Sequence, residues 1–408
     1  MFTNMGMSKG DMAMYTSLLY LPWVIKPLWS PFVDIIRTKR WWVMVMQVLM
    51  SVAFALTAFT LPHPSAEVIA SGTTPVSLFF STLVLFWITA FASATHDIAA
   101  DGFYMLALEP DQQSFYVGIR STFYRLSSIF GQGVLVVIAG LLETRLGDIP
   151  KAWSITLLVS AVIFAGITLW HTFFMPRPSA DSLRSSDHYG SSAGDIMKEF
   201  GRTFVTFFSK KGVLIAMLFM LLYRLPEAFL VKMMNPFLLD PIAKGGLGLS
   251  TQSVGFIYGT VGVAALTVGG ILGGIAAARW GLKKCMWPMA LALTLPCLSF
   301  VFLSAFQPES LWITGTCVAL DQFGYGFGFT AYMLYLIYFS DGEFKTAHYS
   351  LCTAFMALSM MLPGMIAGYI QEWVGYTWFF GFVMVCCLVT VAVTFLVKVD
   401  PQYGRKRQ

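Results

Sequence analysis

The chain of 408 residues is 57% hydrophobic and only 12% charged, whereas an ordinary soluble domain carries roughly 25% charged residues. So much apolar surface excludes a water-soluble globular protein. The net charge of +5 is explained by basic loops between apolar stretches and does not indicate binding to nucleic acid. The composition therefore predicts a polytopic membrane protein.

A helix needs about 20 apolar residues to cross the hydrocarbon core of a bilayer, and eleven stretches of the chain reach this length. They are too long and too uniformly apolar for the alternating segments of an outer-membrane barrel, so we expect an all-α fold. In chain order, the predicted spans are 13–33, 41–61, 77–106, 115–142, 152–174, 212–238, 252–278, 284–305, 310–340, 345–371 and 376–397.

The longest polar stretch separates five predicted spans from six. We predict an N-terminal helical bundle (1–174), a cytoplasmic linker (175–211) and a C-terminal helical bundle (212–408). Within the linker, IMKEFGRTFVTFF can lie amphipathically on the inner leaflet.

A tight basic turn follows the first span in one half, SPFVDIIRTKRWW (30–42), and the second span in the other, AARWGLKKCMW (277–287). If the halves are repeats, as in many transporters, the first half lacks its opening helix. We therefore expect a twelve-helix architecture of which eleven helices are present, unless a span has been miscounted.

Lys and Arg concentrate in alternate loops, chiefly 33–41, 175–211 and the C-terminal tail. Because cytoplasmic loops carry the excess of Lys and Arg, we expect the C-terminus to lie in the cytoplasm and the N-terminus outside.

Charged residues within the spans follow a period of three helices. If the spans are numbered two to twelve, numbers three, six, nine and twelve contain no Asp, Glu, Lys or Arg, whereas two, four, five, seven and ten do. Charged side chains are costly in hydrocarbon and face a protein interior or a water-filled path. The pattern predicts that every third helix faces lipid and that others line a central polar cavity, as in a carrier with alternating access.

The stretch THDIAADGFY (95–104) supplies the candidate proton-coupling residues Asp97, Asp101 and His96. The two aspartates are spaced i, i+4 and point the same way, and two carboxylates that close in a low-dielectric site repel, which favours binding of a proton. Alternatively, each is ion-paired, for example with Lys26, Arg120 or Arg125. His96 either titrates near neutral pH or hydrogen-bonds a backbone carbonyl.

The candidate substrate-binding residues lie on several spans. Arg125 is placed to clamp a carboxylate bidentately or to pair with the aspartates above, and Lys232 is a candidate for an anionic ligand. Arg224 and Glu227 are one turn apart and pair with each other in the simplest alternative. Aromatic rings on polar helices either stack on sugars or belong to the core and the interfacial belt. The full set is Lys26, Arg125, Arg224, Glu227, Lys232, Asp321, Tyr20, Trp23 and Tyr325.

Five local motifs in register identify a family resemblance. They are IKPLWSPFVD (25–34), THDIAADG (95–102), FYRLSSIFGQG (123–133), LYRLPEAF (222–229) and LDQFGYGFGF (320–329). Together they resemble the AmpG-type muropeptide permeases of the major facilitator superfamily, with ER acetyl-CoA transporters as more distant relatives. The resemblance implies a proton symporter of the bacterial inner membrane that imports N-acetylglucosaminyl-anhydro-N-acetylmuramic acid with or without peptide.

The resemblance also implies a cytoplasmic gate, because the superfamily's loop between its second and third helices forms conformation-dependent ion pairs. Plain positive-inside topology explains the basic residues of this loop equally well, but not its aspartate. The implied gate residues are Asp34, Arg37, Lys39, Arg40, Arg120, Arg279 and Lys283.

The alternatives are a carrier for another sugar, peptide or acyl-CoA-like anion, a non-transporting truncated remnant, and a membrane-embedded enzyme with His96 and an aspartate as acid and base. No nucleophile motif, nucleotide loop or metal-ligand spacing accompanies the last, and the six cysteines suit burial as small hydrophobes. We therefore predict a monomeric carrier with no enzymatic activity, cofactor or metal.

Overall fold

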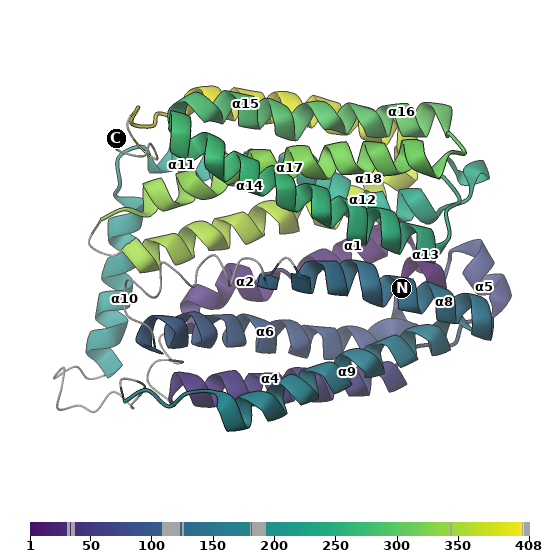
Figure 1. Ribbon diagram of the computed structural model, residues 1–408, viewed down its shortest axis with the longest axis horizontal. Helices are drawn as coiled ribbons and strands as arrows, with labels where there is room; N and C mark the ends of the chain where they lie inside the picture. The colour runs from purple at the N-terminus through teal and green to yellow at the C-terminus, as the bar shows by residue number, and fades with distance from the viewer. Residues whose placement is uncertain are drawn as a thin grey trace.

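The computed structural model describes residues 1–30, 33, 37–107, 123–124, 126–179, 181, 193–342, 345–401 and 403. Within these residues the regular structure is helical throughout, and no strand occurs. The long helices lie side by side in two stacked bundles, with the two termini at opposite ends (Figure 1). This arrangement confirms the all-α prediction.

The N-terminal bundle consists of short helices α1, α2 and α5 and long helices α4, α6, α8 and α9. Side-chain oxygens cap several of them: Ser8 accepts from the backbone N–H of Asp11 in α1, and Asp148 accepts from that of Lys151 in α9. The bounds are α1 Lys9–Leu18, α2 Leu21–Ile25, α4 Lys39–Phe59, α5 Ala66–Ser71, α6 Phe80–Ala107, α8 Leu135–Leu146 and α9 Ile149–Phe174, with a π-helical turn at Phe130–Val134 before α8.

The C-terminal bundle follows α10 (Ala193–Phe208), which stands across the ends of the long helices (Figure 1). Its helices are α11 Val213–Leu222, α12 Leu225–Leu239, α13 Thr251–Val254, α14 Val263–Trp280, α15 Leu282–Thr294, α16 Leu298–Phe306, α17 Leu311–Ser340 and α18 Lys345–Leu396, with a π-helical segment at Gly255–Gly262 between α13 and α14.

Eight helices of the described chain are long and apolar enough to cross a membrane. They cover nine of the predicted spans, because the last of them, His348–Leu396, contains two spans separated at Gly375, where φ is 76°. The predicted span 310–340 is α17. The predicted span 13–33 is not one continuous helix: α1 ends at Leu18 and α2 begins at Leu21, directly before a proline that has no N–H to donate.

The two bundles touch along two seams. One joins α1 to α18, and the other joins Phe130–Val134 and α8 to α13 and Gly255–Gly262. Glycines permit this approach, since a Cβ at Gly368 would clash with the carbonyl of Lys9, and one at Gly259 with that of Gln132.

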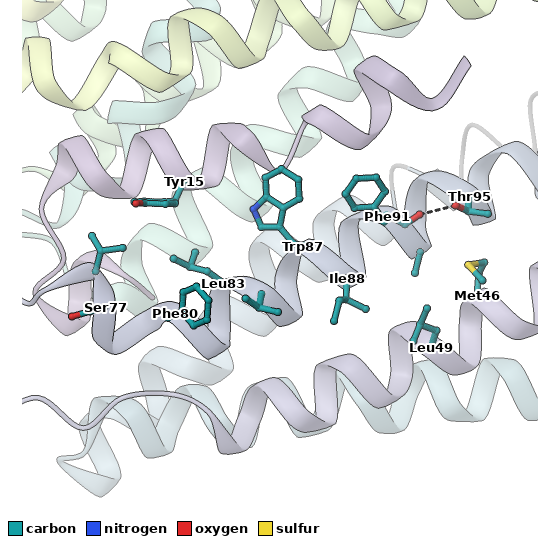
Figure 2. Close-up of a pocket in the computed structure, with 13 residues that line it drawn as sticks. Tyr15, Met46, Leu49, Ser77, Phe80, Leu83, Trp87, Ile88, Phe91 and Thr95 are labelled. Atoms are coloured by element: carbon teal, nitrogen blue, oxygen red, sulfur yellow. Dashed lines mark hydrogen bonds between the residues drawn. The ribbon is translucent and has the colours of Figure 1, made fainter. Parts of the chain in front are cut away.

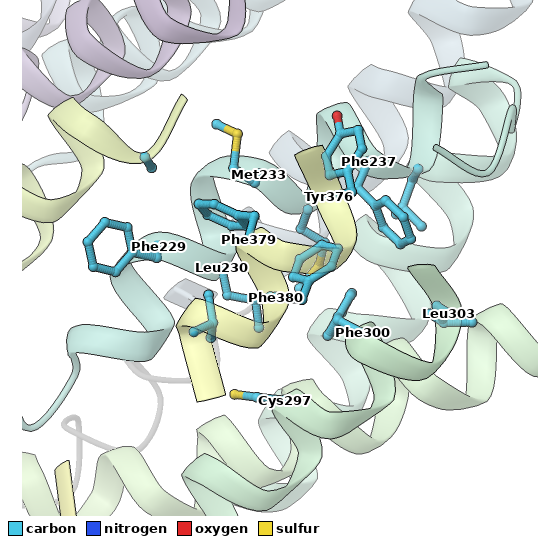
Figure 3. Packing of buried hydrophobic residues seen from close by; sticks show 14 of the residues in the cluster. Phe229, Leu230, Met233, Phe237, Cys297, Phe300, Leu303, Tyr376, Phe379 and Phe380 are labelled. Carbon is cyan, nitrogen blue, oxygen red and sulfur yellow. The ribbon is translucent and has the colours of Figure 1, made fainter. Parts of the chain in front are cut away.

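The core of the C-terminal bundle is aromatic. Phe237 of α12, Phe300 of α16 and Phe380 of α18 are completely buried and their rings meet edge to face or tilted (Figure 3). The linker helix α10 is anchored to the same bundle, because Phe207 is completely buried and the Lys210 ammonium donates to the carbonyls of Phe339 and Asp341 at 2.7 and 2.8 Å. That C-terminal bundle is therefore a packed body to which the linker helix is attached.

Candidate substrate and proton site

A charged cluster lies inside the C-terminal bundle where α11 passes into α12. The backbone leaves the helical conformation at Arg224, which precedes α12 with Pro226 in the first turn of that helix. Three polar side chains are buried here: Arg224 and Glu227 of this segment and Asp321 of the neighbouring helix α17 are 6%, 2% and 2% exposed. Their burial in a largely apolar bundle marks this cluster as a candidate site.

Arg224 is surrounded by aromatic rings. Its guanidinium donates to the hydroxyl of Tyr325 and lies 4.6 Å from the ring centre of Phe329 and 5.8 Å from that of Tyr332. Among the described residues no salt bridge joins Arg224 to Glu227, and the guanidinium Nε has no hydrogen-bond partner. The Tyr325 hydroxyl and the aromatic rings therefore hold this cation, rather than the salt bridge with Glu227 that was considered from the sequence.

The carboxyl groups of Glu227 and Asp321 are near enough for their charges to interact. Asp321 accepts a hydrogen bond from Gln322 at 3.0 Å, whereas Oε1 of Glu227 is buried without a partner in the described structure. A buried carboxylate oxygen normally has a donor. This oxygen is therefore available to carry a proton or to accept from a ligand.

Lys232, two turns after the break, reaches toward the other bundle. Its ammonium donates to the hydroxyl of Thr16 in α1 at 3.1 Å and lies 5.4 Å from the ring centre of Tyr20. The Tyr20 hydroxyl interacts electrostatically with Arg224 and Glu227. Tyr325 therefore belongs to the cluster inside the C-terminal bundle, and Lys232 and Tyr20 extend that cluster toward α1. Trp23 lies half-buried on α2.

In the N-terminal bundle, Lys26 and Asp97 form a salt bridge of 2.9 Å, with their side chains 14% and 38% exposed. Of the two possibilities considered from the sequence for Asp97, proton coupling or an ion pair, the structure shows the ion pair. Asp101 lies half-buried one turn further along α6. The His96 ring contacts the side-chain amide of Gln47 at 3.2 Å, and Gln47 also contacts His171 of α9 at 2.9 Å. Sequence reasoning missed Gln47 and His171, because it followed charged residues and treated α4 and α9 as lipid-facing helices.

The structure places some of the expected gate residues within a single bundle. The Arg40 guanidinium donates to the carbonyl of Thr172 at 3.0 Å, while Asp181 accepts from the backbone N–H groups of Lys39 and Arg40 at 2.7 and 2.9 Å. Arg37 lies over Trp41, Arg279 over Trp280, and Lys283 is exposed. Asp34, Arg120 and Arg125 lie outside the described residues.

The opposite end of the molecule carries a polar network that the sequence did not reveal. Lys9 forms a salt bridge of 2.6 Å with Asp240, which also accepts from the Tyr376 hydroxyl at 2.9 Å. The backbone N–H of Gly10 donates to Glu372 at 3.0 Å. We call Lys9, Gly10, Asp240, Glu372 and Tyr376 the latch, since they join α1 to the C-terminal bundle.

A second group at this end joins α8 to α13. Asn4 donates to Glu143 at 2.9 Å, and Thr251 donates to the same carboxylate at 2.7 Å. Together with Lys9, Asp240 and Glu372 of the latch, these residues line a polar cavity of about 590 Å³, which we call the vestibule.

A larger cavity, of about 780 Å³, is almost entirely apolar. Figure 2 shows Tyr15 of α1 and Trp87 and Phe91 of α6 along its walls. It contains no charged side chain, so despite its size it offers a sugar or an anion little beyond apolar contact. The charged cluster around Arg224 is chemically better suited to bind a polar substrate.

Comparison with known proteins places this geometry in a family. The family described as Major Facilitator Superfamily matches residues 1–344 and again residues 227–408. The chain is 23% identical over 396 residues to the anhydromuropeptide permease of Escherichia coli strain K12, covering 96% of this chain and 73% of that protein. It is 25% identical over 389 residues to putative transporter AmpG 4 of Rickettsia conorii, covering 93% and 86%.

Solved structures share the fold. A D-xylose-proton symporter matches with a TM-score of 0.69 at 14% identity, over 97% of this chain and 89% of that one. The nucleoside transporter NupG matches with a TM-score of 0.63 at 16% identity, over 97% and 91%. At such identities the likeness shows the fold alone, while the relatives confirm the resemblance to AmpG-type permeases.

Proposed function

The chain belongs to the major facilitator superfamily, and we propose that it is a secondary active transporter that imports anhydromuropeptides by proton symport. The substrate is N-acetylglucosaminyl-anhydro-N-acetylmuramic acid with or without its peptide. The observation that carries the proposal is the similarity over 96% of the chain to a protein named anhydromuropeptide permease.

The chemistry of the charged cluster supports this substrate class. A muropeptide combines sugar rings with carboxylates, and the cluster combines aromatic side chains with two cations, Arg224 and Lys232. The planar guanidinium of Arg224, which keeps an unused Nε–H, suits a carboxylate that accepts two parallel hydrogen bonds. Tyr20 and Tyr325 offer faces on which a sugar ring can stack.

The two ends of the molecule suit alternating access. We assign the vestibule end to the outside and the α10 end, with the C-terminus, to the cytoplasm of a bacterial inner membrane, because basic residues concentrate in the loops at the α10 end. The latch then closes the outer side. Import requires the latch to open and the bundles to rock about the central site.

The experiment is uptake of labelled anhydromuropeptide by proteoliposomes that contain the purified chain, with and without an inward proton gradient. Accumulation that depends on the gradient and is competed by unlabelled anhydromuropeptide, but not by free glucose or amino acids, supports the proposal. No uptake of muropeptide, with uptake of a different anion such as an acyl-CoA, would overturn the substrate assignment.

A further inference from the structure

We infer that the coupling proton binds between Glu227 of α12 and Asp321 of α17, and that the Lys26–Asp97 pair is a structural contact. This inference rests on the proposed proton symport and names its site. The proposed proton site thus lies in the C-terminal bundle, whereas the i, i+4 spacing of Asp97 and Asp101 had suggested a site in the N-terminal bundle.

The burial of the two pairs differs. Glu227 and Asp321 are each 2% exposed, and in the described structure neither forms a salt bridge. The side chain of Asp97 is 38% exposed and its charge is already balanced by Lys26 at 2.9 Å. Two neighbouring carboxylates that share one buried site strongly disfavour the doubly ionised form, whereas a salt-bridged carboxylate favours ionisation.

The surroundings of Glu227 and Asp321 fit one proton. The cation that acts on Glu227 is Arg224, which directly precedes α12, and its guanidinium is held by Tyr325. The other titratable groups that face the pair are Tyr20, Tyr258 and the Cys297 thiol. With these neutral and one proton on the pair, the net charge of the pair and Arg224 is zero, which is the least costly state for a closed, low-dielectric site.

Both acids stand on elements that reach the other bundle. Glu227 shares α12 with Lys232, whose ammonium contacts Thr16 of α1. Asp321 is followed by Gln322, which packs against Gly262 at the end of the π-helical segment Gly255–Gly262. That segment contacts Phe130–Val134 of the N-terminal bundle. A change of charge at the pair therefore acts on helices that form both seams between the bundles.

The proton step involves no electron transfer. When the site opens outward, a proton from the outside adds to a carboxylate oxygen and forms an O–H bond. When the site opens inward, that bond dissociates, the proton leaves to the cytoplasm and the pair returns to two carboxylates.

The first arm of the test needs no substrate. Purified protein in liposomes is titrated from acid to alkaline pH while the infrared C=O band of protonated, buried carboxyl groups is recorded. We expect the band in the wild type and in Asp97→Asn, and its absence in the double variant Glu227→Gln/Asp321→Asn. The swapped variant Glu227→Asp/Asp321→Glu, which keeps two carboxyl groups at the site, should retain the band at a shifted frequency.

The second arm measures transport. For one proton per substrate, a gradient of one pH unit sustains about tenfold accumulation, and the double variant should lose this accumulation. A band that survives in the double variant, or that disappears in Asp97→Asn, would overturn the inference. If the infrared band changes as expected but neither the wild type nor any variant transports muropeptide, the proton site is supported and the proposed substrate is wrong.

Discussion

The latch offers a prediction whose size follows from the structure. Replacing Asp240 with Asn removes the charge that pairs with Lys9 at 2.6 Å, while the amide oxygen still accepts from Tyr376. We expect the variant to spend more time with the vestibule end open, because this pair joins α1 to the C-terminal bundle only when that end is closed.

The magnitude depends on burial. Both latch side chains are 18% exposed; fully exposed pairs contribute about 0–1 kcal/mol, and breaking a fully buried pair costs about 3–5 kcal/mol. Since the retained Tyr376 hydrogen bond reduces the loss, we expect about 1–2 kcal/mol, which shifts the ratio of closed to open states by about 5- to 30-fold.

The assay is electron paramagnetic resonance between spin labels at Arg145→Cys and Glu309→Cys, both exposed at the vestibule end. The native cysteines are buried or half-buried. The Asp240→Asn variant should populate longer distances than the wild type. Asp148→Asn is the matched control, since Asp148 only caps α9 within the N-terminal bundle. Unchanged distances in Asp240→Asn, or an equal change in the control, would refute the assignment of the latch.

Three further predictions concern other contacts. Asp97→Asn leaves the Lys26 ammonium without its partner, so we expect a lower thermal midpoint in differential scanning fluorimetry. The double variant Lys26→Met/Asp97→Asn should recover part of this loss, because no charge is then left unpaired. A double variant that is less stable than Asp97→Asn would contradict this reasoning. Gly259→Ala should separate the bundles in the spin-label assay because a Cβ there meets the backbone of Gln132, whereas Gly274→Ala, with open space around it, should not. Arg224→Lys keeps the charge but loses the planar guanidinium, so muropeptide affinity should fall about tenfold or more in a binding assay; unchanged affinity would remove Arg224 from the site.

The membrane-spanning helices were predictable from the sequence because length and apolar composition decide them. Predicted bounds such as 284–305 lie close to the observed span Leu282–Phe306. The break at Leu18 to Leu21 was missed, since an apolar run reads as one helix even where a proline and a turn interrupt it. The separation of the last two spans at Gly375 was placed correctly because glycine and polar residues mark it.

The site was predicted less completely, because side-chain partners are set by packing rather than by spacing. Arg224 and Glu227 are one turn apart in the sequence, yet the backbone break at Arg224 turns the guanidinium toward the rings of α17. Lys26 was correctly included among the possible partners of Asp97. The latch joins residues more than 200 positions apart, such as Lys9 and Asp240, and no local pattern reveals such a contact.

The most direct test of proton-coupled import records substrate and proton together. Proteoliposomes with a pH-sensitive dye inside, and no imposed gradient, receive anhydromuropeptide on the outside. We predict that the lumen acidifies as labelled substrate enters, and that the double variant Glu227→Gln/Asp321→Asn abolishes the acidification. Entry of muropeptide by the wild-type chain with no change in luminal pH would contradict proton symport.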